Sequence, residues 1–110
     1  MKELISQIAP LVADELERAN KLHGDYFRSD HEGESVIREE MQEVDDETTE
    51  IEMHYSMMWE AVKDDNPMRA AQSAYKMQQA AIRAAAESIQ VAAMCRKFIF
   101  SQQIRDSKVK

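Results

Sequence analysis

IREEMQEVDDETTEIEMHYSMMWEAV, residues Ile37 to Val62, is the stretch that predicts the fold of this chain. Eight positions in it recur at alternating steps of four and three residues, which is the spacing of coiled-coil-like helix packing. The stretch therefore predicts one long helix, from about residue 30 to Lys63, with an apolar face along its length. We call these positions the heptad seam: Ile37, Met41, Val44, Thr48, Ile51, Tyr55, Met58 and Val62.

A turn and a second long helix are expected after this stretch. Asn66 suits the N-cap position of a helix, and Pro67 suits the first helical position, where a missing N–H costs nothing. From Pro67 to about Arg105 no residue interrupts the helical pattern. Apolar residues lie on every side of this helix between residues 80 and 100, which indicates burial between several neighbours.

The N-terminal part predicts a shorter amphipathic helix. Apolar residues between Lys2 and Leu22 follow three- and four-residue steps. Gly24 can adopt the left-handed conformation that ends a helix. In the connection that follows, residues 25–30, Ser29 and Glu32 have capping-box spacing, so the next helix should begin near residue 30.

Composition bounds the fold class. The chain has 110 residues, 44% hydrophobic content, and only two Gly and two Pro. These values favour one all-α domain covering residues 1–110. Two long helices and one short helix do not easily close into a globule, so we expect long antiparallel helices completed by a second copy. The expected assembly is a homodimer or tetramer with a four-helix-type bundle.

Charge and targeting features exclude several classes of function. The net charge of −7 argues against binding nucleic acid through phosphate neutralisation. No signal peptide and no run of 18 apolar residues appear, so we expect a cytoplasmic protein without membrane contact. The single cysteine, Cys95, cannot form an intramolecular disulfide, and we expect it to be buried as a small apolar residue.

Acidic residues occupy an unexpected edge of the long helix. On a helical wheel Glu40 falls inside the apolar arc, Glu43 lies on its margin, and Glu39 lies further out. A carboxylate in apolar surroundings costs several kcal/mol unless it is paired, protonated or bound to a metal. This edge of the helix therefore calls for a partner.

The last helix offers the opposing half of a site. Glu87 and Gln90 lie among apolar residues and are three positions apart in the sequence. If the two long helices run antiparallel, residues equally distant from the turn face each other, so Glu43 pairs with Glu87 and Glu40 with Gln90. Oxygen ligands without His or Cys favour Mg²⁺ or Mn²⁺. The alternative is that these acids are solvated or form salt bridges with nearby arginines, namely Arg38, Arg83 and Arg96.

Two motifs resemble a known family. Glu39-Glu40-Met41-Gln42-Glu43 is similar to the Glu-Glu-x-x-Glu motif of MazG-like, all-α nucleoside triphosphate pyrophosphohydrolases. Glu87-Ser-Ile-Gln90 is similar to the second motif of that family, Glu-x-x-Asp, with Gln90 in place of the Asp. The resemblance, including the sequences flanking both motifs, covers about residues 23 to 100 and points to the small MazG-like proteins of bacteria and phages.

The resemblance implies a fold and an activity. It implies a MazG-like helical bundle in a bacterial or phage-infected cytoplasm, and Mg²⁺-dependent cleavage of a nucleoside triphosphate to the monophosphate and pyrophosphate. The implied metal ligands are Glu40, Glu43, Glu87 and Gln90. Glu39 is the candidate for orienting or deprotonating the attacking water, so Glu39, Glu40 and Glu43 form the predicted catalytic set.

Other residues are candidates for substrate contact. Lys97 lies on the same side of its helix as Gln90 and is placed to meet phosphates. Tyr26, Phe27 and His31 are candidates for contact with a nucleobase, and core packing or capping is the alternative for each. The competing hypothesis for the whole chain is a non-enzymatic helical dimer whose heptad seam serves assembly and whose acidic site is degenerate, which the neutral Gln90 favours.

Overall fold

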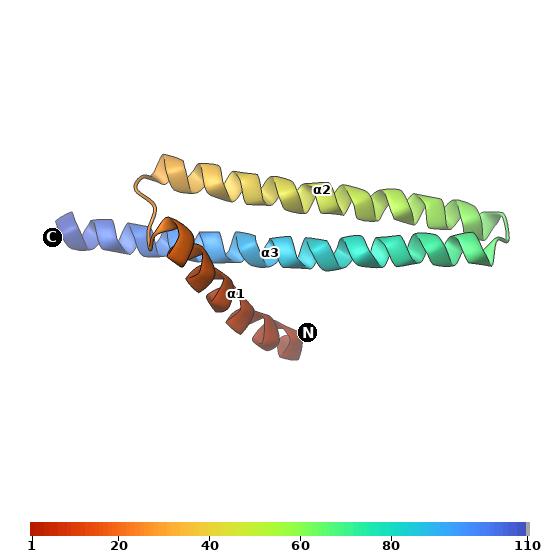
Figure 1. Cartoon of the computed structure of the whole chain (residues 1–110), viewed down its shortest axis with the longest axis horizontal. Helices are drawn as coiled ribbons and strands as arrows, with labels where there is room; N and C mark the ends of the chain where they lie inside the picture. Colours follow the sequence, from red (N-terminus) through yellow and green to blue (C-terminus); the bar gives the residue numbers. More distant parts are fainter. Residues whose placement is uncertain (110) are drawn as a thin grey trace. The chain divides into compact units, whose positions relative to one another are not determined.

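A computed structural model describes residues 1–109 of the chain and contains three helices (Figure 1). They are α1 (Lys2–His23), α2 (Asp30–Lys63) and α3 (Pro67–Val109). No strand occurs in the described range, so the all-α prediction is confirmed. The sequence predicts that the last helix ends near Arg105, but helix α3 continues to Val109.

The helix ends follow from local side chains. Gly24 ends α1 with φ 90°, a value that a residue without Cβ adopts without strain. The Ser29 hydroxyl accepts a hydrogen bond from the Glu32 N–H at 3.1 Å, which caps the start of α2. The Asn66 side chain accepts one from the Arg69 N–H at 3.1 Å, so Asn66 caps α3 as predicted.

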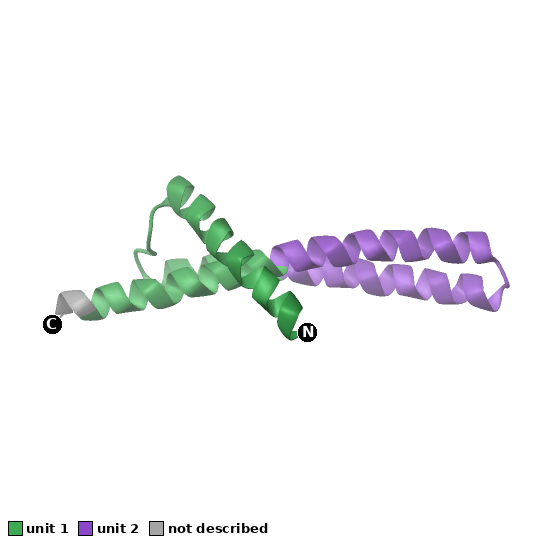
Figure 2. Cartoon of the chain, turned by 90° about the horizontal axis from the view of Figure 1, so that it is seen from below, with its two compact units in different colours: residues 1–41, 88–110 green, residues 42–87 purple. Residues whose placement is uncertain are grey.

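The residues group into two compact units, which Figure 2 colours separately. Unit 1 consists of residues 1–41 and 88–110, and unit 2 of residues 42–87. Each unit contains segments that are distant in sequence. The prediction of one domain over residues 1–110 remains a prediction.

Unit 2 is a helical hairpin in which residues 42–63 of α2 and 67–87 of α3 run side by side in opposite directions (Figures 1 and 2). The buried residues of this hairpin have small side chains: Ala61 and Ala80 are fully buried, and Ser73 is buried. Small residues let two helix backbones approach closely. The heptad seam is only partly used in this contact, because Thr48, Tyr55 and Val62 are exposed.

Unit 1 contains the apolar core. Phe27, Ala93 and Met94 are buried at its centre. Six partly buried apolar side chains from α1, α2 and α3 pack against them: Val12, Leu16, Ala19, Val36, Ile37 and Phe98. The connection between α1 and α2 thus contributes a central core residue, Phe27. Cys95, one residue after Met94, is exposed, so the expectation that it is buried is wrong.

Gly33 allows the start of α2 to lie directly against two aromatic rings of unit 1. A Cβ atom at this position would lie 2.6 Å from Cδ2 of Phe98 and 2.9 Å from Cδ2 of Phe27. Both distances are shorter than van der Waals contact permits. Only glycine fits without movement of the rings.

The described residues contain no helix that is long and apolar enough to cross a membrane.

Candidate functional site

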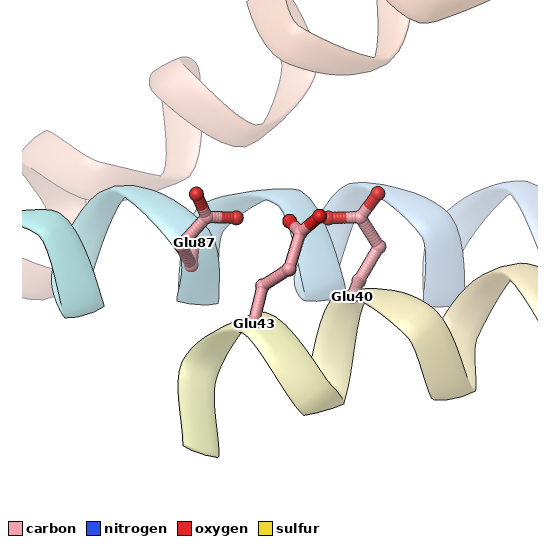
Figure 3. A group of neighbouring side chains, drawn as sticks. All are labelled: Glu40, Glu43 and Glu87. Carbon is pink, nitrogen blue, oxygen red and sulfur yellow. The ribbon is translucent and has the colours of Figure 1, made fainter. Parts of the chain in front are cut away.

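Three glutamates gather where the sequence predicts a metal site (Figure 3). Glu40 and Glu43 lie one turn apart on α2, and Glu43 and Glu87 both belong to unit 2. Each of the three offers one carboxylate oxygen, and these oxygens lie within 4.8 Å of one another. Glu43 is exposed, while Glu40 and Glu87 are half-buried. We call this group the acid cluster.

An ion pair in unit 2 has the register that brings Glu43 opposite Glu87. The Arg83 Nε donates a hydrogen bond to Glu47 Oε2 at 2.9 Å. Arg83 precedes Glu87 by four residues and Glu47 follows Glu43 by four, so in each pair the two residues are equally distant from the turn at residues 64–66. Neighbouring pairs in an antiparallel hairpin are expected to share such a register.

The acid cluster has the chemistry of a site for a hard cation. Carboxylates about 5 Å apart repel each other by on the order of 1 to 3 kcal/mol per charged pair, and a divalent cation reverses the sign of this interaction. Oxygen ligands of Mg²⁺ lie about 2.1 Å from the ion, so two of them can be at most about 4.2 Å apart, compared with about 5 Å for Ca²⁺. The three oxygens lie within 4.8 Å of one another, so modest side-chain movements bring them to the ligand spacing of either cation. The residues present therefore fit a divalent cation.

A cavity of about 370 Å³ lies in unit 1 beside the first of these glutamates. Five of the residues that the sequence singles out line it: Glu39, Glu40, Gln90, Phe27 and Lys97. The cavity wall thus contains carboxylates, an amide, an aromatic ring and an ammonium group. This volume is within the range of small-molecule sites.

Glu15 and Arg18 of α1 add a charged pair to the same cavity wall. The Arg18 Nε donates a hydrogen bond to Glu15 Oε2 at 3.1 Å, and a second contact joins Arg18 Nη2 to the other carboxylate oxygen. This hydrogen bonding lowers the pKa of Glu15 and raises the pKa of Arg18. Both groups therefore stay charged near neutral pH.

Lys97 is buried, with 3% of its surface exposed. Its ammonium nitrogen donates to the Gly24 carbonyl oxygen at 2.8 Å and lies 4.9 Å from the centre of the Phe27 ring. Burial lowers the pKa of Lys97 below its ordinary value of 10.5, and the charges of Glu32 and Asp25 oppose this shift. Lys97 thus contacts the connection between α1 and α2 through Gly24 and Phe27.

The other predicted substrate contacts lie outside this cavity wall. Tyr26 is 46% exposed and His31 is exposed, and neither is among the residues that line the 370 Å³ cavity. Phe27 lines the cavity but is also 4% exposed and central to the core of unit 1. Of the two interpretations of Phe27, core packing is therefore the one that its burial supports.

Ser101 was missed in the sequence analysis. This residue of α3 forms a side-chain hydrogen bond with the connection between α1 and α2. Ser101 is 1% exposed and accepts a hydrogen bond from the Phe27 N–H at 2.8 Å. One signal was present, because Ser101 follows Met94 and Lys97 at helical three- and four-residue steps and so shares their face. A serine on that face indicates a buried polar contact.

Two of the arginines considered as partners for the acids have other neighbours on α2. Arg38 lies 3.5 Å from Glu34, one turn earlier on α2, and Arg83 pairs with Glu47. These pairs are surface contacts of modest energy. Arg96 lines a separate pocket of unit 1 together with Asn20 of α1.

Comparison with known proteins does not identify a family for this chain: no family model matches, and neither the curated proteins nor the solved structures include a match.

Proposed function

We propose that this protein is a Mg²⁺-dependent nucleoside triphosphate pyrophosphohydrolase of the MazG-like kind, with Mn²⁺ as a possible substitute for Mg²⁺. The observation that carries the proposal is the convergence of Glu40, Glu43 and Glu87, with Glu40 also lining the 370 Å³ cavity. A ligand in this cavity has carboxylates for a divalent cation at one side and an aromatic ring and a lysine within the same wall. That combination suits a molecule with a base, a sugar and a chain of phosphates.

Each residue has a defined part in this proposal. Glu40, Glu43 and Glu87 hold the cation through carboxylate oxygens, and the Gln90 side-chain carbonyl is the fourth candidate ligand. When bound, the cation offsets the charge of the phosphate oxygens and makes water a better nucleophile. Glu39, in the cavity wall beside Glu40, accepts the proton of the attacking water.

The reaction that these residues support is hydrolysis at the α-phosphorus. Water forms a bond to the α-phosphorus, the bond from this phosphorus to the α,β-bridging oxygen breaks, and pyrophosphate leaves with that oxygen. Positioning and charge stabilisation supply most of the acceleration in such reactions. Gln90 reduces the negative charge of the site by one relative to the family motif, so a weaker cation affinity is expected.

The direct test is product analysis after incubation with standard and modified nucleoside triphosphates and Mg²⁺. We expect a monophosphate and pyrophosphate in equal amounts from at least one substrate. Glu43→Gln and Glu87→Gln should each lower kcat by about 100-fold or more, because each removes a charged ligand. Glu52→Gln, on an exposed position of the same helix α2, is the matched control. A folded protein that hydrolyses none of the panel would refute the enzyme proposal.

A homo-oligomer forms part of the proposal because the single chain exposes more surface than a compact monomer does, including many large apolar side chains. Its accessible surface is 8169 Å², compared with about 6,200 Å² expected for a compact monomer of 12.7 kDa. The excess of about 2,000 Å² per chain is of the size that obligate homodimers bury. Exposed members of the heptad seam, Met41, Tyr55 and Val62, are candidates for this contact.

The same exposed seam favours the second candidate function, a non-enzymatic helical assembly protein. Sedimentation velocity measures the oligomeric state, and Tyr55→Glu should shift it towards the monomer because a charge cannot be buried cheaply in an apolar contact. Glu52→Gln, at an exposed position of α2 outside the heptad seam, is the control and should leave the oligomeric state unchanged. Oligomerisation without hydrolysis of any nucleotide would favour the assembly protein over the enzyme.

A further inference from the structure

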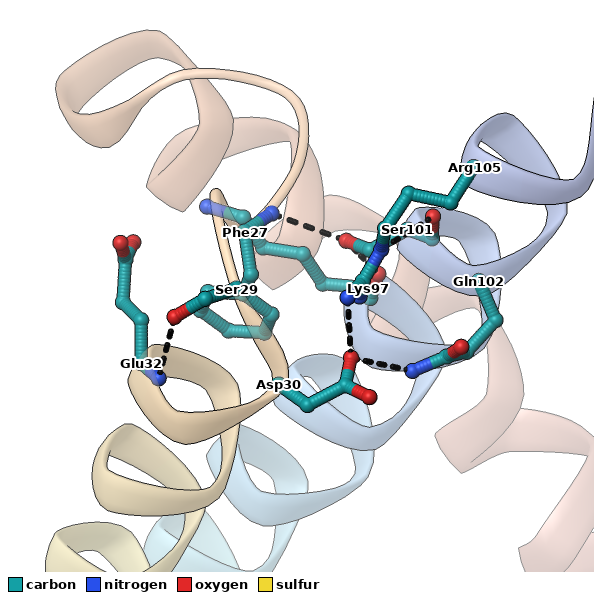
Figure 4. Close-up of polar contacts among 8 residues, drawn as sticks. All are labelled: Phe27, Ser29, Asp30, Glu32, Lys97, Ser101, Gln102 and Arg105. Atoms are coloured by element: carbon teal, nitrogen blue, oxygen red, sulfur yellow. Dashed lines mark hydrogen bonds and ion pairs between the residues drawn. The ribbon is translucent and has the colours of Figure 1, made fainter. Parts of the chain in front are cut away.

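Polar side chains of α3 hold the connection between α1 and α2 at two points. Figure 4 shows one of these contacts, between Phe27 and Ser101. The Gly24 carbonyl accepts a hydrogen bond from Lys97 Nζ, and the Phe27 N–H donates one to Ser101 Oγ, both at 2.8 Å. The Ser101 hydroxyl in turn donates to the Lys97 carbonyl at 2.8 Å. Two side chains one turn apart on α3 thus hold backbone groups at two points of the same connection.

The burial of these two side chains makes the network specific. Phe27, Lys97 and Ser101 are 4%, 3% and 1% exposed, so the Phe27 N–H and the Lys97 ammonium do not readily find water if they lose their partners, whereas Gly24 is exposed. Leaving a buried polar group without a partner costs more than a hydrogen bond contributes on average. The conformation of residues 24–29 in which both contacts form is therefore strongly preferred.

The connection is also part of the cavity wall in unit 1. Phe27 and Lys97 line the same cavity as Glu40 and Gln90. Movement of the connection displaces the Phe27 ring and removes the acceptor of the Lys97 ammonium. The shape of the cavity and the conformation of the connection therefore depend on the same two contacts.

From these contacts we infer that Lys97 and Ser101 are positioning residues that clamp the α1–α2 connection as a wall of the cavity, and thereby set its affinity for a ligand. Lys97 acts here through the Gly24 carbonyl and the Phe27 ring, which differs from direct contact with phosphates. The effect on nucleotide affinity rests on the proposed function, whereas the clamp itself does not.

A second set of contacts provides a matched control. Asp30, the first residue of α2, accepts a hydrogen bond from Gln102 Nε2 and forms an ion pair with Arg105. These contacts also join α3 to the end of the connection, but none of the three residues lines the cavity. Gln102→Ala removes one of them without touching the clamp.

Limited trypsin digestion tests the clamp in the ligand-free protein, because Arg28 lies exposed within the connection. Ser101→Ala should accelerate cleavage after Arg28 by about tenfold, the loss of a buried hydrogen bond expressed as a rate. Lys97→Met, which keeps the length of the side chain, should do the same. Mass spectrometry of the fragments then compares the rate of cleavage after Arg28 with the rate after Arg83, which lies within the unit 2 hairpin. Equal acceleration at both sites, or no difference from Gln102→Ala, would overturn the clamp.

Steady-state kinetics test the effect on the cavity. Ser101→Ala should raise KM for the nucleotide by about fivefold to tenfold and leave kcat within about twofold, since the acid cluster is unchanged. An unchanged KM in a variant whose Arg28 is cleaved faster would overturn the positioning role. If no nucleotide is hydrolysed, the proposed function fails, and the digestion result still decides whether the clamp exists.

Discussion

Arg83 and Glu47 pair across the two helices of unit 2, with 2.9 Å between Arg83 Nε and Glu47 Oε2. The pair lies four residues along each helix from Glu87 and Glu43, towards the turn. Within each pair, the two residues are equally distant from the centre of the connection at residues 64–66. Counting from the turn predicts which residues of the two helices face each other, and the Arg83–Glu47 ion pair has this spacing.

Divalent cations should stabilise the protein through the acid cluster. With Mg²⁺ at about ten times its dissociation constant, the free energy of unfolding should rise by about 1.4 kcal/mol, and Tm by several degrees. Glu43→Gln should remove most of this increase, because it deletes the charge of one ligand. Differential scanning fluorimetry with and without Mg²⁺ measures the change, with Glu52→Gln as control. An equal Mg²⁺ effect in both variants would show that the cation binds elsewhere.

Gly33→Ala should destabilise unit 1. Alanine favours a helix by about 1 kcal/mol over glycine, but its Cβ would lie 2.6 Å and 2.9 Å from ring atoms of Phe98 and Phe27. Overpacking of a core costs about 1 to 3 kcal/mol, and here two rings must shift together. We therefore expect a net loss of about 1 kcal/mol in urea unfolding. A more stable Gly33→Ala protein would mean that the rings yield without cost.

Lys97 should give the protein a distinctive dependence of stability on alkaline pH. Burial lowers the pKa of Lys97 in the folded state below its ordinary value of 10.5. Between these two values the unfolded chain binds more protons than the folded one, so the free energy of unfolding rises with pH. Below the folded-state pKa the cost of burying the charge is fully present.

Urea unfolding between pH 8 and pH 11 measures this effect as a difference between the wild type and Lys97→Met. The stability of the wild type relative to the variant should increase as the pH approaches 10.5 and then level off. Taking the difference cancels the other lysines and tyrosines. A difference that does not change with pH would mean that Lys97 has the same pKa in both states.

Asn66→Ala should weaken the hairpin of unit 2. The Asn66 side chain accepts a hydrogen bond from the Arg69 N–H at 3.1 Å at the start of α3. Loss of an N-cap costs about 1 kcal/mol, whereas Asn66→Asp keeps an acceptor and should cost little. Thermal unfolding followed by circular dichroism compares the two variants. Equal stability of the Ala and Asp variants would contradict a capping role.

Local sequence features determined where the helices begin and end. Gly24, Ser29, Asn66 and Pro67 act on the backbone within a few residues of themselves, so their effects do not depend on distant parts of the chain. The grouping of Glu43 with Glu87 was also predictable, because a short turn between two helices limits which residues can face each other. Counting residues outward from the turn gives this pairing whatever side chains lie between the two helices.

The tertiary structure alone decided which faces of the helices are used. Thr48, Tyr55 and Val62 follow the heptad spacing but are exposed, whereas Ala61 and Ala80 are fully buried. Lys97 is buried against the Gly24 carbonyl, and Cys95, two residues earlier, is exposed. Whether such a side chain is buried depends on residues that are distant in sequence. Lys97 and Ser101, for example, bond to residues more than 70 positions away. The pattern of one helix shows which side chains share a face, but burial depends on what the rest of the chain places against that face.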